Sequence, residues 1–216
     1  WIRVLASGGA ALSEPTQEAV FTTVRERPGP VTNARVTTAT TTTVTLQWQA
    51  PSAGAPVASY SVYCPAASGP PTVPPHPSGT QSVTLVGLPP GHSFECSIVA
   101  VGLDDLQGPT VAVPAQTSFV PPRPPDNVSV GLGTSRLSLW WILTPTFGAP
   151  PVSGFDVDYR QVGASGWTRK TTTDQAIELT PLTGGTRYEV RVRTVAGGLT
   201  SEFTPVVSAT TVPSAP

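Results

Sequence analysis

The chain has 216 residues, a formal net charge of −1 at neutral pH and only 12% charged residues, compared with about 25% in ordinary soluble domains. A basic surface that binds nucleic-acid phosphates is therefore not expected. No apolar run reaches the roughly 18 residues that a spanning helix needs, so we expect no membrane span in this segment. Proline accounts for 26 residues, and threonine runs almost unbroken through Thr37–Thr43; this composition excludes a helical protein.

Strands are expected in three groups along the chain. Residues 1–27 have the pattern of a strand, a loop and a strand, and a proline-rich linker, VRERPGP, follows at residues 24–30. Alternating residues then predict seven strands, near residues 31–39, 42–50, 57–66, 70–74, 80–86, 92–101 and 109–117. After a second linker, VPPRPPD, seven more are expected, near residues 127–134, 136–143, 152–161, 166–173, 176–180, 187–196 and 204–212. We therefore divide the chain into residues 1–27, 28–119 and 120–216.

The second and third groups are copies of one unit. Leu88–Ile98 reads LPPGHSFECSI and Leu182–Val192 reads LTGGTRYEVRV. Each has a leucine, a turn with glycine, an aromatic residue six positions after the leucine, and then strict alternation. Spacings of 93 or 94 residues separate Phe94 from Tyr188, Trp48 from Trp141 and Asn33 from Asn127. Such a spacing corresponds to a whole sandwich domain and not to a solenoid unit.

An aromatic residue that follows a turn and opens an alternating strand is the pattern of a tyrosine corner. At these residues the chain resembles the fibronectin type III family, whose sixth strand carries the pattern L-x-P-x-x-x-Y-x-V-x-V. The later copy keeps Tyr188 but has Thr183 and Gly184 where the family favours proline, and the earlier copy keeps the prolines but has Phe94. The resemblance implies an all-β fold of tandem seven-stranded Greek-key β-sandwiches, with immunoglobulin-like architecture. We expect the Tyr188 hydroxyl to bond the backbone near residues 182–184.

Residues 1–28 align without gaps on residues 189–216. This alignment identifies residues 1–27 as the C-terminal strand pair of a preceding, incomplete domain of the same type. Because a two-stranded hairpin is marginally stable by itself, the expectation is that further strands precede it in a longer protein. The alternative is that a neighbouring chain completes the domain by strand addition.

The catalytic inventory is small. The two histidines, His76 and His92, are expected in exposed loops, and the carboxylate pair Asp104–Asp105 is expected at a loop tip. No nucleophile motif, metal-ligand cluster or phosphate-binding loop is present. We therefore expect no enzymatic activity, no cofactor and no metal site in this segment.

The two cysteines fall on the buried parity of neighbouring antiparallel strands. Cys64 shares parity with Tyr60 and Val62, and Cys96 with Phe94 and Ile98. Facing pairs of this kind approach closely enough for a disulfide, which would indicate an oxidising compartment. Two buried free thiols remain the alternative.

Asn127-Val128-Ser129 is a sequence motif for N-glycosylation, whereas the equivalent Asn33-Ala34-Arg35 is not. A three-residue motif occurs often by chance. Asn127 is therefore a candidate glycosylation site and nothing stronger at this point.

Outward parity identifies three surface features. In the last domain, the aspartates Asp156 and Asp158 should oppose Arg191 and Arg193 on the neighbouring strand, and Arg160 should oppose its Glu189 end, which we interpret as a solvated ladder of charges. The same face of the middle domain is nearly uncharged, so Tyr63 and Val99 are candidates for contact with a partner protein. Trp140 is out of parity with its neighbours and points outward, either as a contact anchor or under a loop.

These features predict a non-catalytic segment of an extracellular or cell-surface protein that acts in adhesion, spacing or fibre structure. Its partners would be other proteins or further copies of the same protein, with no nucleic acid. Two alternatives are a spacer segment of a secreted multidomain enzyme and the ectodomain segment of a signalling receptor. Fold alone does not choose among them.

Overall fold

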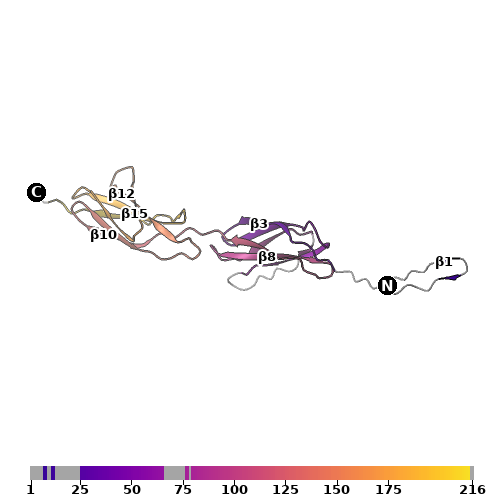
Figure 1. Ribbon diagram of the computed structural model, residues 1–216. Coiled ribbons are helices and arrows are strands. Elements are labelled where there is room, and N and C mark those ends of the chain that lie inside the picture. Colours follow the sequence, from indigo (N-terminus) through magenta and orange to yellow (C-terminus); the bar gives the residue numbers. More distant parts are fainter. Residues whose placement is uncertain (1–6, 9–10, 13–24, 66–75, 78, 215–216) are drawn as a thin grey trace.

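The computed structural model describes residues 7–8, 11–12, 25–65, 76–77 and 79–214. Two β-sandwiches follow one another along the chain, joined end to end by a short linker (Figure 1). Each sandwich packs a three-stranded sheet against a larger one, and no helix occurs among the described residues. The predicted all-β, tandem-sandwich fold is confirmed.

The described residues of the middle domain form seven strands. Its smaller sheet has the order β3 (Thr32–Ala39), β4 (Thr43–Gln49) and β7 (Ser82–Val86). Its larger sheet has the order β6 (His76–Pro77), β5 (Val57–Tyr63), β8 (Ser93–Gly102) and β9 (Val111–Gln116). The core lies between the sheets, where the Trp48 and Tyr60 rings meet edge to face at 5.4 Å.

The last domain repeats this plan with one additional short strand, β16, which the sequence did not predict. Its smaller sheet has the order β10 (Asp126–Leu132), β11 (Leu137–Ile142) and β14 (Ala176–Leu179). Its larger sheet has the order β13 (Thr168–Thr172), β12 (Val152–Gln161), β15 (Arg187–Ala196) and β16 (Leu199–Thr200), and β17 (Val207–Thr210) also pairs with β15. Trp141 and Phe155 meet in the core at 5.1 Å, as their equivalents do in the middle domain.

The tyrosine corner is present in the last domain. The Tyr188 ring is buried, and its hydroxyl oxygen accepts a hydrogen bond from the backbone N–H of Thr183 at 3.0 Å. This contact ties the turn before β15 to the strand that follows it. The expected bond to residues 182–184 is therefore found, with the hydroxyl as acceptor.

Two histidines lie differently from the prediction. His76 was expected to face solvent in an extended loop, but it belongs to β6, pairs with Tyr60 on β5 and is half-buried 6.4 Å from the Trp48 ring. His92, also expected to be exposed, is half-buried and stacks on Phe94. Both differences arise from contacts with neighbouring strands or rings, which a loop assignment does not anticipate. The strand expected near residues 70–74 lies outside the described residues.

At the N-terminus, β1 (Ser7–Gly8) and β2 (Ala11–Leu12) form an antiparallel pair. Ser7 pairs with Leu12 and Gly8 with Ala11. The ungapped alignment places these residues on Val195, Thr200, Ala196 and Leu199, which are paired in the same register. The remainder of residues 1–24 lies outside the described residues, so the incomplete domain at residues 1–27 stays a prediction.

The linker between the sandwiches is held by backbone contacts. The N–H of Val120 donates to the carbonyl oxygen of Gly148 at 2.9 Å. Gly91 and Gly148 both have positive φ, and a Cβ atom on Gly148 would lie 2.8 Å from the Cβ atom of Pro90. A Cβ atom on Gly91 would lie 2.9 Å from the Gly148 carbonyl oxygen. The turn before β8 in one domain therefore touches the turn before β12 in the next, at a distance that only glycine allows.

Candidate interaction face

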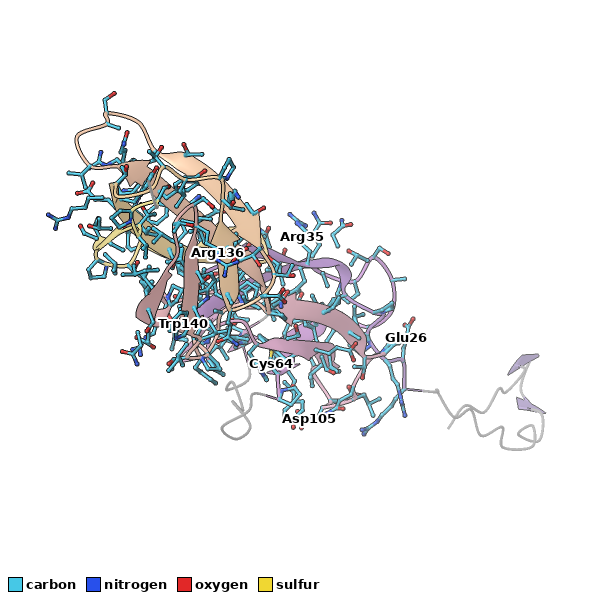
Figure 2. The ribbon with its side chains drawn as sticks, turned by 90° about the vertical axis from the view of Figure 1, so that its left-hand side faces the viewer. Glu26, Arg35, Cys64, Asp105, Arg136 and Trp140 are labelled. Atoms are coloured by element: carbon cyan, nitrogen blue, oxygen red, sulfur yellow. A yellow bond between two sulfur atoms is a disulfide. The ribbon has the colours of Figure 1, made fainter. Side chains whose placement is uncertain are left out.

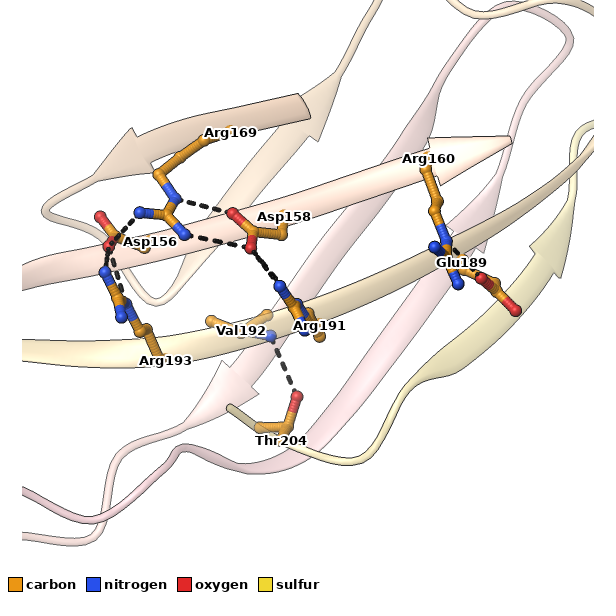
Figure 3. A network of polar contacts seen from close by, with 9 residues as sticks. All are labelled: Asp156, Asp158, Arg160, Arg169, Glu189, Arg191, Val192, Arg193 and Thr204. Atoms are coloured by element: carbon orange, nitrogen blue, oxygen red, sulfur yellow. Dashed lines mark hydrogen bonds and ion pairs between the residues drawn. The ribbon is translucent and has the colours of Figure 1, made fainter. Parts of the chain in front are cut away.

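The outer face of β12, β13 and β15 in the last domain carries the densest group of charged side chains (Figure 3). The antiparallel register sets Asp156 opposite Arg193, Asp158 opposite Arg191 and Arg160 opposite Glu189. Because these pairs face each other on one side of the sheet, their side chains can meet without crossing the core. This register is the one that the sequence predicts.

Asp158 is the centre of this group. Its side chain is 2% exposed and lies between two arginines: Arg169 donates through Nε and Nη2 to the two carboxylate oxygens, and Arg191 donates through Nε and Nη2 to Oδ2. Burial by itself raises the pKa of Asp158, but the hydrogen bonds and positive charges of Arg169 and Arg191 outweigh it and lower the pKa. The hydrogen bond to Asp158 also raises the pKa of Arg169. The charged state of this buried carboxylate is therefore stabilised.

Two further ion pairs extend the group along the strands. Asp156 accepts from Arg193 at 2.7 Å and lies 3.4 Å from Arg169, which thus bridges both aspartates. At the other end, Arg160 Nε lies 2.7 Å from a Glu189 oxygen. Four arginines meet three carboxylates, so the face keeps a small excess of positive charge.

Aromatic rings cover the arginines. The Trp167 ring lies between the guanidinium groups of Arg160 and Arg191, each 4.3 Å from its centroid. The Phe203 ring lies 4.1 Å from the Arg191 guanidinium and 4.9 Å from that of Arg193. Cation–π contacts of this kind contribute about 0.5–2 kcal/mol each, more where water is excluded. Alternating rings and guanidinium groups therefore form a continuous row across the sheet.

The interpretation of this face as solvated is wrong. Asp156 and Asp158 are buried, and the arginines paired with them are less than half exposed. The reason is that Trp167, just before β13, and Phe203, between β16 and β17, fold over the arginines. The sequence offered one signal: Trp167 shares outward parity with Arg169 and Thr171 on the neighbouring strand. Phe203 lies in a loop, where parity gives no indication.

Chemically, this face is suited to binding another molecule. Every carboxylate in it is paired with arginine. Among the residues that the structure describes, no three His, Cys, Asp or Glu side chains are grouped so that they could hold a metal ion. Arginine and tryptophan are the residues that most often dominate protein interfaces. The row offers both types in fixed geometry.

The three predicted contact residues do not form one site. Tyr63 and Val99 share the outer face of β5 and β8, since Tyr63 pairs with Ser97 and Val99 with Ser61, and Tyr63 is 46% exposed. Trp140 lies on β11, in the smaller sheet of the last domain (Figure 2). It is 49% exposed, which agrees with its outward parity.

The disulfide predicted from strand parity is present in the structure. Cys64 and Cys96 are bonded, and both are fully buried in the core of the middle domain. Cys64 follows directly after β5, and Cys96 lies on the neighbouring β8. No other cysteine occurs in the chain.

Comparison with known proteins gives the same architecture. The sequence profile of the fibronectin type III domain matches residues 29–110 and, separately, residues 123–210. The chain belongs to the fibronectin type III family. Each matched region coincides with one of the two sandwiches, and together they include most of the chain.

Relatives of this type III pair include a human receptor-type tyrosine-protein phosphatase H, 33% identical over 144 residues. That alignment covers 66% of this chain and 12% of the phosphatase. Among solved structures, the FN1–FN3 domains of chicken CNTN1 are 19% identical with a TM-score of 0.46, covering 86% of this chain and 67% of that one. A two-domain fibronectin type III segment of chicken tenascin is 21% identical with a TM-score of 0.42, covering 83% and 99% respectively.

No helix in the described part of the chain is long and apolar enough to cross a membrane.

Proposed function

We propose that this type III pair is a non-catalytic spacer in an extracellular or cell-surface protein, which holds its domains at a set distance and angle and presents their outer faces to other proteins. The observation that carries the proposal is the joint between the domains. In it, backbone hydrogen bonds tie the linker to each domain, from Gly91 to Ser118 and from Val120 to Gly148, and the turns of Gly91 and Gly148 are in direct contact.

A joint of this kind supports spacing because it leaves little room for rotation. Hydrogen bonds fix Ser118 to the middle domain and Val120 to the last domain, and the Gly91 and Gly148 turns are in contact, so a change of angle must separate these turns or push Gly148 into Pro90. The linker itself, VPPRPPD, is rich in proline and resists bending. Interfaces between domains of one chain otherwise permit relative motion by default.

The experiment is a measurement of residual dipolar couplings on the two-domain protein. If the joint is rigid, one alignment tensor fits both domains. Gly148→Ala places a Cβ atom against Pro90 and should separate the tensors. Gly163→Ala is the matched control, because Gly163 also has positive φ but an added Cβ atom there would meet no other atom within 4 Å. Two independent tensors in the wild-type protein would refute the proposal.

The ectodomain of a signalling receptor is the alternative that one observation favours. A human receptor-type tyrosine-protein phosphatase is 33% identical to this pair over 144 residues. The complete open reading frame distinguishes this alternative from the others: further type III repeats indicate a fibre or adhesion protein, a spanning helix indicates a receptor, and a catalytic domain in a secreted protein indicates an enzyme.

Two further parts of the proposal concern location and extent. The buried disulfide supports an oxidising compartment, since such bonds are rare where thiols are kept reduced. The shared register of β1–β2 and β15–β16 supports the assignment of residues 1–27 to a further type III domain. The candidate partner surfaces are the uncharged face with Tyr63 and Val99 and the arginine–aromatic row of the last domain.

A further inference from the structure

The two domains share one irregular feature in their first strands. β3 and β10 each contain a bulge, at which Asn33 and Asn127 adopt left-handed conformations with φ of 51° and 53°. Thr32 pairs with Gln49 before the first bulge, and Asp126 with Ile142 before the second. The backbone therefore presents both asparagine side chains in the same way.

In the middle domain Asn33 is exposed, and its side chain is hydrogen-bonded. The Asn33 amide donates to Gln49, while Arg35 donates both to the Asn33 carbonyl and to the Gln47 side chain. The side chains are thus paired, Asn33 with Gln49 and Arg35 with Gln47, on the outer face of β3 and β4.

In the last domain the same four positions carry different chemistry. Ile142 and Trp140 stand in place of Gln49 and Gln47, and Ser129 stands in place of Arg35. The Asn127 side chain is exposed and makes no hydrogen bond to any described residue, while the Ser129 hydroxyl donates to the Asn127 carbonyl. Ile142 and Trp140 are 55% and 49% exposed and lie on the same outer face of β11, where they form an apolar pair. Ser129 thus completes an N-glycosylation motif at Asn127, whose side chain is not hydrogen-bonded to a described residue. The equivalent Asn33 is bonded to Gln49 and is not part of such a motif.

We propose that Asn127 carries an N-linked glycan whose first N-acetylglucosamine covers Ile142 and Trp140. In the secretory pathway, an oligosaccharyltransferase forms a bond between Nδ2 of Asn127 and C1 of the sugar. The bond from C1 to the phosphate oxygen of a polyprenyl-diphosphate donor breaks, the amide loses one proton, and the polyprenyl diphosphate leaves. After folding, the apolar face of the sugar packs on the isoleucine and indole side chains, which removes an exposed apolar patch from water.

The test begins with expression of the 216-residue chain in a secretory animal cell line. Intact mass should fall by the mass of one glycan after treatment with peptide N-glycosidase, and Ser129→Ala should abolish that change. A secreted wild-type protein without a glycan would overturn the proposal. Arg35→Ser is the matched variant, since it creates the same motif at Asn33, where Gln47 and Gln49 replace the apolar pair.

The position of the sugar is tested by hydroxyl-radical footprinting. Trp140 should be oxidised several-fold more slowly in the glycosylated protein than after enzymatic removal of the glycan or in Ser129→Ala. Trp141 is the internal control, because it is buried in either form. Equal oxidation of Trp140 with and without the glycan would overturn the packing of the sugar on this face. In Arg35→Ser, the additional glycan at Asn33 should leave the oxidation rate of Trp140 equal to that in the glycosylated wild-type protein.

Discussion

The tyrosine corner permits a prediction that links the two domains. Tyr188→Phe removes only the hydroxyl that accepts from the Thr183 N–H. A hydrogen bond of this kind stabilises a folded protein by about 0.5–1.5 kcal/mol, and an unpaired buried partner costs more. Thr183 is an exposed residue, so water can reach its N–H once the hydroxyl is gone. We therefore expect a loss of about 1 kcal/mol in the free energy of unfolding of the last domain.

The reverse change in the middle domain should bring no gain. Phe94 is the equivalent of Tyr188, but the equivalent of Thr183 is Pro89, which has no N–H to donate. The two turns are otherwise alike, since the carbonyl oxygen of Pro89 accepts from Thr117 and that of Thr183 from Thr211. Phe94→Tyr alone should therefore leave stability within about 0.5 kcal/mol of the wild type.

Introducing both partners into the middle domain should create the tyrosine-corner hydrogen bond there. Pro89→Thr together with Phe94→Tyr supplies donor and acceptor in a turn whose carbonyl is already in place. A double-mutant cycle should give a coupling energy of about 1 kcal/mol. Denaturant titrations monitored by hydrogen-exchange mass spectrometry report the unfolding midpoint of each domain separately. An unchanged midpoint for Tyr188→Phe, or a stabilising effect of Phe94→Tyr as large as that of the double variant, would refute the reasoning.

Three further predictions concern covalent and ionic contacts. Alkylation without reductant should add no mass at Cys64 and Cys96 in the native protein, and reduction should destabilise the middle domain by about 3–4 kcal/mol, as expected for a closed loop of this length; two alkylated thiols would contradict this. Because the pKa of Asp158 is lowered by folding, its contribution is complete above the unfolded value near 3.9 and is lost as pH falls from there through the lower folded value. Removing one partner of a buried ion pair costs about 3–5 kcal/mol, so Asp158→Asn, whose arginine partners are partly exposed, should cost about 3 kcal/mol at neutral pH. It should also flatten the decline in stability below about pH 4, and an unchanged decline in urea titrations at acid pH would exclude this role. Trp167→Ala should destabilise the last domain by more than loss of an ordinary surface residue, by about 1–2 kcal/mol, whereas Trp167→Phe should keep part of the effect; equal stability of both variants and the wild type would show that the stacking contributes nothing.

The elements that the sequence predicted well are those governed by alternation and spacing. The pairing of Asp158 with Arg191, the bonding of Cys64 to Cys96 and the burial of Tyr188 all follow from which side of a strand each residue occupies. Side-chain direction alternates along each strand, and the pairing of neighbouring antiparallel strands brings residues of one face together, so these contacts could be inferred from spacing alone.

The alternation of side chains along a strand did not predict which residues cover each face of a sheet. The charged ladder was predicted in register but interpreted as solvated, because Trp167 and Phe203 cover it from outside the paired strands. His76 was assigned to a loop because two residues flanked by prolines carry no alternation, yet it pairs with β5.

The amino-acid sequence by itself therefore determined the sandwich, its repeat, the core-facing side chains and the covalent link, since each depends on spacing along one strand or between adjacent strands. The tertiary structure alone decided which charges are buried, how the Gly91 and Gly148 turns meet, and which side chain of the equivalent pair Asn33 and Asn127 is hydrogen-bonded to a neighbour. Those outcomes depend on contacts between loops or side chains far apart in the chain, and they are selected by packing in three dimensions and not by local periodicity.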